Sequence, residues 1–361
     1  MWGDGHLVVR MEWTFLSKCR NNIHTIRMLR VRKIVALTCD KITRNSTMKN
    51  TAPGRAAHGI DLTKTALGLG LALVACTAGA QEIEPRAYSN APVGLNFLIA
   101  AYAHSQGGLA TDPSLPLEDA HLKIDSGVLA YVRTLDLWGK LGKFDVILPY
   151  SQLSGTALFA GTPAERHVVG MGDPRLRVAI NLYGMPAVSM AEFAAHREDL
   201  VIGTSVQVSA PGTQYDPNRV VNLGTNRWSI KPDIGFSRAF GAYMLDLTAG
   251  VTFFTDNDDF YGGKHLEQAP LYSMQANLSY SFSGGAWAAL GATFYTGGQT
   301  TLDGVRKDDA MRNSRAGLIV ALPVDRHNSI KFNVSRGATT RIGTAFSTLG
   351  VAWQYRWADG F

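Results

Sequence analysis

Residues 81–361 of this 361-residue chain contain no cysteine, because Cys19, Cys39 and Cys76 all lie earlier. This absence excludes disulfide-stabilised folds and thiolate metal sites in that part. Long hydrophobic runs are also missing, since the longest, residues 66–75, has about ten residues and is too short for a membrane-spanning helix. After it no segment has the 3.6-residue period of long amphipathic helices. Helical membrane proteins and helical bundles are therefore excluded.

Excess charge of either sign is absent after residue 80. The first 80 residues hold 12 of the 35 Lys and Arg and 4 of the 29 Asp and Glu, which leaves 23 basic and 25 acidic residues. The basic character of the whole chain therefore belongs to its beginning. It gives no support for a nucleic-acid partner.

Residues 48–80 have the pattern of a cleaved signal peptide. Met48 would be a normal start, Lys64 precedes the apolar run, and Ala78-Gly79-Ala80 forms a cleavage site before Gln81. The alternative is lipoprotein processing with acylation of Cys76, since residues 73–76 (LVAC) fit a lipobox. Residues 1–47 are expected to be an over-extended N-terminus.

What the later residues do contain is period-two alternation in runs of about ten residues. Such alternation places apolar and polar side chains on opposite faces of a strand. Clear examples are residues 175–182, 243–253, 272–282 and 349–357. About twelve runs recur, each near the length of a tilted membrane strand.

The connections between these runs alternate in length. Long segments such as 104–121, 155–173 and 297–312 alternate with short turns such as 238–242. Only 184–198 breaks this rhythm, and its spacing fits either a short amphipathic helix or a polar turn. Long loops on one side and tight turns on the other are typical of outer-membrane barrels.

The predicted fold is therefore all-β, a single transmembrane antiparallel β-barrel of about 12 strands. The polar faces hold Ser, Thr, Gly, Asn and Gln, as a lumen lining does, whereas a soluble β-sandwich, the alternative, would expose more Lys and Glu. We expect residues 81–92 to form an N-terminal periplasmic or plug segment and residues 93–361 to form the barrel. The terminal strand ends on Phe361 and resembles the signal read by the barrel-assembly machinery.

Several motifs resemble the transporter family named for the meta pathway of phenol degradation. They are PGTQYDP (211–217), NLGTNRW (222–228), FFTDNDDF (253–260), SRAG (314–317), SRG (335–337) and GMGDPR (170–175). The resemblance covers most of residues 85–357. It implies an outer-membrane barrel that admits aromatic or other hydrophobic compounds.

Charged and polar residues on the predicted inner faces and at the loop mouths are candidates to line a passage. They are Arg175, Arg177, Asn226, Arg227, Lys231, Asp233, Asp246, Arg315, Lys331, Gln354 and Arg356. They could tune selectivity, or they could pair and close a narrow lumen, since buried charges need partners. The acidic run 256–259 could hold Ca²⁺, but an ordinary capped loop fits it better.

The functional hypothesis is an outer-membrane channel for passive uptake of small hydrophobic, phenol-like compounds, with outer-membrane lipids as partners. No catalytic residues, cofactor or metal ligands are expected, because neither a G-x-S-x-G nor an H-E-x-x-H motif is present. The alternatives are a structural or adhesive barrel without transport and a lipid hydrolase. Bilayer conductance would separate the first alternative, and lipolysis lost on one Ser or His substitution would identify the second.

Overall fold

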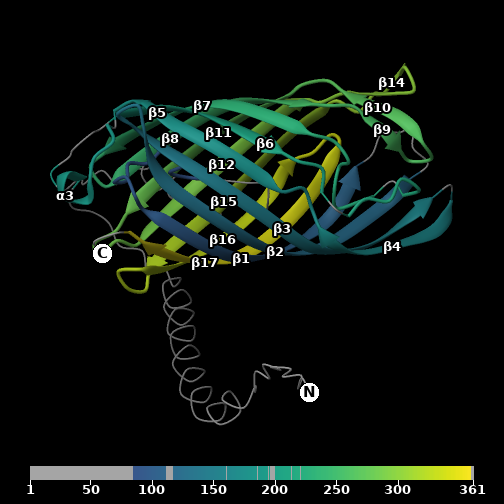
Figure 1. The fold of residues 1–361 in the computed structure, drawn as a ribbon. Helices are drawn as coiled ribbons and strands as arrows, with labels where there is room; N and C mark the ends of the chain where they lie inside the picture. The colour runs from purple at the N-terminus through teal and green to yellow at the C-terminus, as the bar shows by residue number, and fades with distance from the viewer. Residues whose placement is uncertain are drawn as a thin grey trace, which may run out of the picture. The chain divides into compact units, whose positions relative to one another are not determined.

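Twelve antiparallel strands close into one barrel in the computed structural model, which describes residues 84–110, 117–159, 161–184, 186–193, 195, 200–212, 214–219 and 221–358 (Figure 1). The first strand pairs on one side with the second and on the other with the last. The barrel strands are β1 (Asn96–Ala110), β2 (Leu117–Leu137), β3 (Lys140–Phe159), β5 (Arg175–Tyr183), β6 (Leu200–Ser209), β7 (Ser229–Phe240), β8 (Tyr243–Phe254), β11 (Leu271–Ser281), β12 (Trp287–Gly297), β15 (Met311–Pro323), β16 (Asn328–Thr339) and β17 (Gly343–Trp357).

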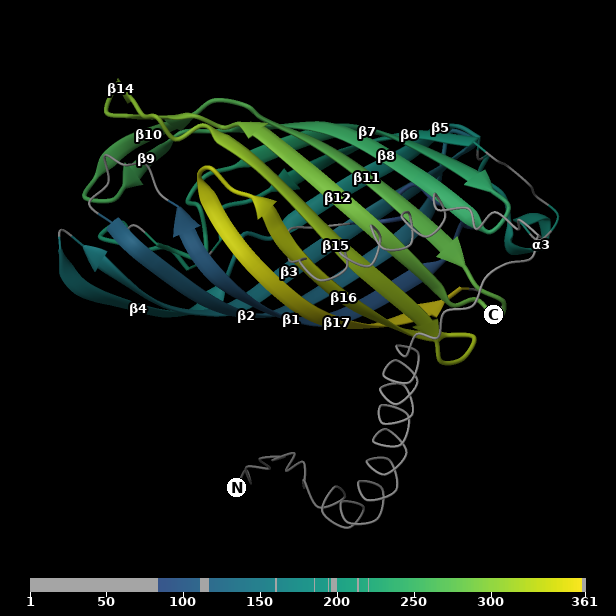
Figure 2. The ribbon, with the colours of Figure 1, turned by 180° about the vertical axis from the view of Figure 1, so that it is seen from behind.

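The remaining elements lie at the two ends of the barrel (Figures 1 and 2). The short-turn end carries the tight turns that follow β2, β7, β11 and β15, together with the helix α3 (Met190–Phe193). The long-loop end carries β4 (Thr162–Met171), which extends the hairpin with β3, and a separate four-stranded sheet. That sheet consists of β9 (Asn257–Phe260), β10 (Lys264–Gln268), β13 (Thr300–Leu302) and β14 (Val305–Arg306).

The outer wall is apolar because alternate residues of each strand point away from the lumen. Large hydrophobic side chains that are 37% exposed or more recur on nearly every strand, for example Leu129, Leu176, Ile234, Leu278, Leu318 and Leu349. Aromatic rings gather near the short-turn end, where Trp353, Tyr355 and Trp357 stack along β17 and Tyr243, Tyr280 and Phe282 meet edge to face. An apolar wall bordered by aromatic rings is that of a transmembrane barrel.

The inner wall takes the opposite residues, and the strand register fixes which these are. On β5, Arg177, Ala179 and Asn181 are buried on the inside, while Leu176 and Val178 are exposed on the outside. The same division holds on β7, β8, β11 and β15, as the alternation predicts.

β1 and β2 depart from this rule, because both of their faces are apolar. The register pairs Phe97 with Arg356 and Ile99 with Gln354, on the inner face of β17, whereas Tyr102 pairs with the outward Val351. Apolar side chains of β1 such as Phe97 and Ile99 therefore face the lumen. Tyr102 and Leu129, exposed by 50% and 49%, face outward.

The predicted all-β fold and its twelve-stranded barrel are confirmed. Four predicted long loops are wrong in extent. β1 and β2 reach into 104–121, β3 and β4 form a hairpin within 155–173, and the separate sheet fills parts of 256–270 and 297–312. Polar strands beyond a membrane need no apolar alternation, so the sequence pattern missed them. Within 184–198 a four-residue helix forms, capped by Ser189, whose N–H and hydroxyl donate to the Glu192 carboxylate at 2.8 and 2.7 Å.

The predicted over-extended N-terminus (1–47), the predicted signal peptide (48–80) and the terminal Phe361 lie outside the described residues. No helix among the described residues is long and apolar enough to cross a bilayer.

Candidate functional site

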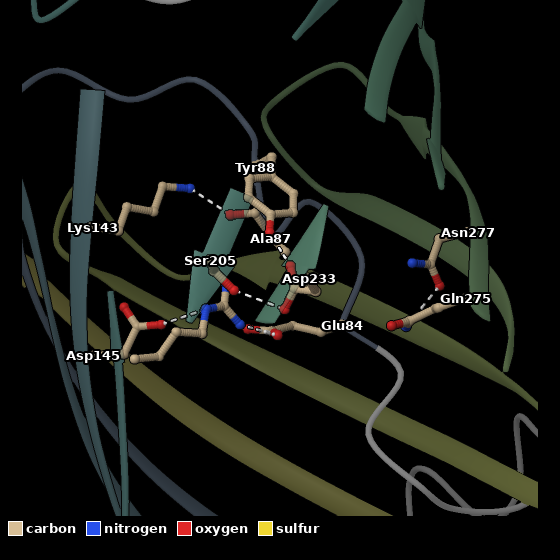
Figure 3. Close-up of polar contacts among 10 residues, drawn as sticks. Glu84, Ala87, Tyr88, Lys143, Asp145, Ser205, Asp233, Gln275 and Asn277 are labelled. Atoms are coloured by element: carbon tan, nitrogen blue, oxygen red, sulfur yellow. Dashed lines mark hydrogen bonds and ion pairs between the residues drawn. The ribbon is translucent and has the colours of Figure 1, made fainter. Parts of the chain in front are cut away.

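Residues 84–95 enter the lumen from the short-turn end, and we call this segment the plug. It contacts inward side chains of β3, β5 and β7 and rests on the inner face of β6 (Figure 3), and it also reaches β8, β11 and β12. The contacts lie in the half of the lumen nearest the short turns.

Tyr88 is buried at the centre of these contacts, with 3% of its surface exposed. Its ring lies on two glycines of the inner wall, where a Cβ on Gly203 or Gly235 would come within 2.2 or 2.1 Å of ring atoms. Its hydroxyl donates to Asp233, which also accepts from Ser205 Oγ at 2.7 Å. The missing side chains of the two glycines therefore form a slot for one aromatic ring.

A charged pair joins the start of the plug to the wall. Arg177 Nη1 donates to the Glu84 carboxylate at 2.6 Å, and Arg177 Nε lies 3.3 Å from Asp145. The Arg177 guanidinium holds the pKa of the Glu84 carboxyl below its ordinary value, and Lys231 and Lys143 act in the same direction. Although Glu84 lies within the lumen, 57% of its side chain remains open to the space inside it.

The backbone of the plug is held by side chains of the wall. Lys143 Nζ donates to the carbonyl oxygens of Ala87 and Ser89 at 2.8 and 3.0 Å, and Asn181 donates to that of Tyr88 at 3.2 Å. These contacts satisfy polar backbone groups that have no secondary structure of their own. Lys143 and Asn181 therefore fix where the plug lies.

Arg86 crosses to the opposite side of the barrel. Its N–H donates to Asp246 at 3.2 Å, its Nη2 donates to Ser281 Oγ at 2.5 Å, and its guanidinium lies 4.7 Å from the centre of the Trp287 ring. A cation over an indole face adds to the hydrogen bonds. Glu84 and Arg86 thus attach the plug to opposite walls.

The plug leaves the lumen at Thr134, which has 1% of its surface exposed. The Thr134 hydroxyl donates to the Pro92 carbonyl at 2.8 Å and accepts from the Leu95 N–H at 2.8 Å. Val93 N–H also donates to the Val188 carbonyl, in the connection between β5 and β6. The segment that broke the loop rhythm therefore holds the chain where it turns into β1.

Between β6 and β7 the described residues 210–212, 214–219 and 221–228 lie at the long-loop end, and we call them the lid. Asp173, just before β5, is their anchor. Its carboxylate accepts from Gly212 N–H at 2.5 Å and from the N–H and hydroxyl of Thr225 at 3.1 and 2.7 Å. A Cβ on Gly212 would lie 2.7 Å from Asp173 Oδ1, so this close approach requires glycine.

Asn257 holds the other side of the lid and has 1% of its surface exposed. It accepts from Asn226 Nδ2 at 2.9 Å and donates to the Tyr215 hydroxyl at 2.9 Å. Next to it Arg227 donates to Gln268 and stacks 4.6 Å from the centre of the Phe254 ring. Burial lowers the pKa of Arg227 to about 10, and its Nε and Nη1 atoms have no hydrogen-bond partner among the described residues.

An apolar cluster lies beneath the lid, on the inner face of the wall. Leu122, Leu153, Val168 and Phe346 are buried together, and Ile124 with the lid residues Val221 and Leu223 packs against them. Arg166 holds this part of the lid by donating to the Val221 carbonyl at 3.0 Å. This part of the lid is therefore held against the inner wall by apolar packing together with the Arg166 hydrogen bond.

An apolar stripe continues from this cluster along the inner face of β2. The register places Ile124, Val128, Ala130 and Val132 on that face, with Ser126 as the polar residue among them, and pairs them with inward residues of β1. The opposite wall is polar, because Gln275 and Asn277 point inward from β11 (Figure 3) and Thr293, paired with Gln275, points inward from β12. The lumen thus has one apolar side and one hydrogen-bonding side.

The predicted site residues fall into three places. Arg177, Lys231, Asp233, Asp246 and Lys331 point into the lumen on the strands around the plug. Asn226 and Arg227 belong to the lid. The others lie apart: Arg175 and Gln354 on inner faces, Arg315 buried near Thr344, and Arg356 at the short-turn rim, where its Nε donates to the Arg326 carbonyl at 2.7 Å.

Other residues of the site were not predicted from the sequence. Lys143 and Asp145 alternate with the apolar residues Phe144 and Val146, so their inward direction could have been inferred from the period-two pattern. Glu84, Tyr88, Asp173 and Asn257 lie outside barrel strands, and no periodicity marks them. The described residues also hold no cluster of three or more His, Cys, Asp or Glu arranged for a metal.

Comparison with known proteins places this architecture in context. A family model described as "Putative MetA-pathway of phenol degradation" matches residues 104–355. An outer membrane channel from Pseudomonas putida F1 has a TM-score of 0.65 and 21% identity, covering 76% of this chain and 100% of that one.

Two further structures are more distant. The TodX monoaromatic hydrocarbon channel, as the deltaS2 mutant, has a TM-score of 0.44 and 10% identity, with coverage of 76% and 93%. The translocator domain of autotransporter NalP from Neisseria meningitidis has a TM-score of 0.42 and 10% identity, with coverage of 82% and 96%. No curated protein matches the chain.

Proposed function

The chain belongs to the phenol-degradation MetA-pathway family, and we propose that it is an outer-membrane channel for passive uptake of small hydrophobic, aromatic compounds. The outer-membrane location is supported by the apolar outer wall and by the fold shared with an outer membrane channel. The long-loop end then faces outward and the short-turn end faces the periplasm. In this function the barrel acts without catalysis.

The observation that carries the proposal is the apolar stripe inside the lumen. Ile124, Val128 and Val132 on the inner wall do not fit a water-filled pore for polar solutes, because exposing apolar surface to water costs free energy. An apolar solute that covers this surface lowers that cost. The polar wall opposite offers amides and hydroxyls to a phenolic oxygen. Such a lumen suits a planar ring with one polar edge.

Passage requires the plug and the lid to move. The lid closes the outer mouth through Asp173 and the apolar cluster, and the plug closes the periplasmic half through Glu84, Arg86 and Tyr88. Both are connecting segments, which open at lower free-energy cost than barrel strands. Diffusion down a gradient then follows transient release of each.

The proposal is tested by flux of phenol and toluene into liposomes that contain the purified barrel. Val128→Asp places a charge in the stripe and is expected to reduce flux about tenfold, since an apolar solute then displaces bound water. Thr248→Asp, on the polar inner wall, is the matched control and is expected to have a smaller effect. Equal flux in protein-free and protein-containing liposomes would contradict the channel function.

A closed barrel without transport is the second candidate, and the contacts that fill both ends favour it. It predicts no solute flux and no conductance even when the plug and lid anchors are removed together, as in Tyr88→Ala with Asp173→Ala. The channel function predicts that this double variant conducts.

A further inference from the structure

A groove of about 800 Å³ lies on the outer wall near the long-loop end, away from the lumen. Its lining comes from β1, β2, β3, β4, β16 and β17. The register points most of its side chains outward. Arg336 pairs with Ser347, Gln106 pairs with Lys123, and Ser154 pairs with His167, and these pairs alternate with the inward ones. The channel proposal leaves this groove unused.

The groove is rich in cationic side chains. Lys123, Arg336, His121 and His167 are exposed in it, against Glu165 as the acid of the lining. No ion pair within the described part of the chain involves Lys123 or Arg336. Their charges are therefore available to an anion from outside the protein.

An apolar band lies directly beneath the groove on the same outer face. Moving toward the short-turn end along the same strands, the outward residues become Leu349, Val334, Tyr102, Tyr150 and Val169, all at least 40% exposed. Between the two levels Asp125 already accepts from His104 at 2.8 Å and from Tyr102 at 2.5 Å. Cations above an exposed apolar surface match a lipid with an anionic headgroup.

We propose that this groove binds the phosphorylated sugar headgroup of an outer-leaflet glycolipid, with its acyl chains on the apolar band. This rests on the outer-membrane orientation in the proposed function. Lys123 and Arg336 take the phosphates, and Gln106, Ser154 and Ser347 offer hydrogen bonds to sugar hydroxyls. A volume of about 800 Å³ suits a disaccharide-sized group rather than a single phosphate.

The test is native mass spectrometry of the purified barrel in detergent, titrated with bisphosphorylated lipid A. Lys123→Gln with Arg336→Gln is expected to weaken binding about tenfold or more, because two charge-assisted contacts are lost. Lys140→Gln with Arg326→Gln removes the same charge from exposed positions at the short-turn end, and should leave binding unchanged. Heat-modifiable migration on a denaturing gel checks that each variant is folded.

Three results would overturn the proposal. The first is equal affinity of the two double variants for lipid A. The second is equal affinity of the unsubstituted protein for lipid A with and without its phosphates. The third is displacement of lipid A by inorganic phosphate at the same concentration, which would indicate a site for free anions. Solute flux separates this test from the channel function, since the groove lies outside the lumen. Loss of lipid binding with unchanged phenol flux supports the groove, and absence of flux in every variant contradicts only the channel.

Discussion

Removing the Tyr88 ring is expected to release the plug from the lumen. The ring is 3% exposed and lies in the slot formed by Gly203 and Gly235, and its hydroxyl donates to Asp233. Truncating a buried aromatic side chain to alanine costs about 3–5 kcal/mol. At about 1.4 kcal/mol for each factor of ten, even the lower figure raises the undocked population on the order of 100-fold.

A buried thiol reports this population directly. Residues 81–361 contain no cysteine, so Ser279→Cys introduces a single thiol into that part. Ser279 has 0% of its surface exposed on the inner wall, one inward position from Ser281, which accepts from Arg86. When docking is fast relative to labelling, the labelling rate follows the undocked population. Tyr88→Ala in this background should therefore label on the order of 100-fold faster.

Two further variants show whether the reasoning is right. Gly235→Ala should give a similar increase, because its Cβ would lie 2.1 Å from a ring atom of Tyr88. Tyr272→Ala removes the same side chain from the outer wall, where it is 52% exposed, and should leave the rate unchanged. Labelling of the Tyr88→Ala and Gly235→Ala variants at the parent rate would refute the docking argument.

Other contacts make comparable predictions. Asp173→Ala leaves three hydrogen-bond donors of the lid without their carboxylate, which should destabilise the closed lid by about 3 kcal/mol. Trypsin should then cleave after Arg219 on the order of 100-fold faster. An unchanged cleavage rate would mean that Asp173 does not anchor the lid. In the docked plug Arg177 lowers the pKa of Glu84 below its ordinary value of 4.5. The ion pair therefore stabilises docking fully above pH 4.5, and this stabilisation is lost as the pH falls through the lowered pKa of the docked state. Labelling of the buried thiol with a dithiopyridine should therefore accelerate in acid. Glu84→Gln should abolish this acceleration, and the control variant Glu192→Gln should keep it. An equal acceleration in both variants would mean that groups other than Glu84 cause it.

The barrel could be predicted from the sequence because lipid contacts its outer wall along the whole of most strands. On β5 the alternation of Leu176 and Val178 with Arg177 gives both the strand and its inner face. On β1 and β2 the alternation does not identify the inner face. Ile99 and Val132 line the apolar side of the lumen, while Leu98 and Leu129 face outward. Where both faces are apolar, period two no longer says which face is inside.

The site was predicted only on its strand side. Arg177 and Asp233 are predicted from the sequence because they stand on the polar faces of alternating strands. Their partners Glu84 and Tyr88 lie about 93 and 145 positions away in an aperiodic segment. No rule on local spacing joins such pairs, because the closed ring of strands brings them together. The lid motif was recognised as a family resemblance, and its physical role as a latch on Asp173 emerged from the three-dimensional contacts.

The pairing of β1 with β17 also determines when the barrel can be completed. All 15 residues of β1 find one set of partners in the last strand, and the contacts span most of the described chain. Loop-closure entropy must be overcome across that separation, so the seam between β1 and β17 is expected to form late in folding. A chain cut short before Gly343 would keep two unpaired edges, on β1 and β16, each a template for association with other strands. By pairing with both edges, the final strand therefore removes the two sites at which the folding chain could associate with other strands.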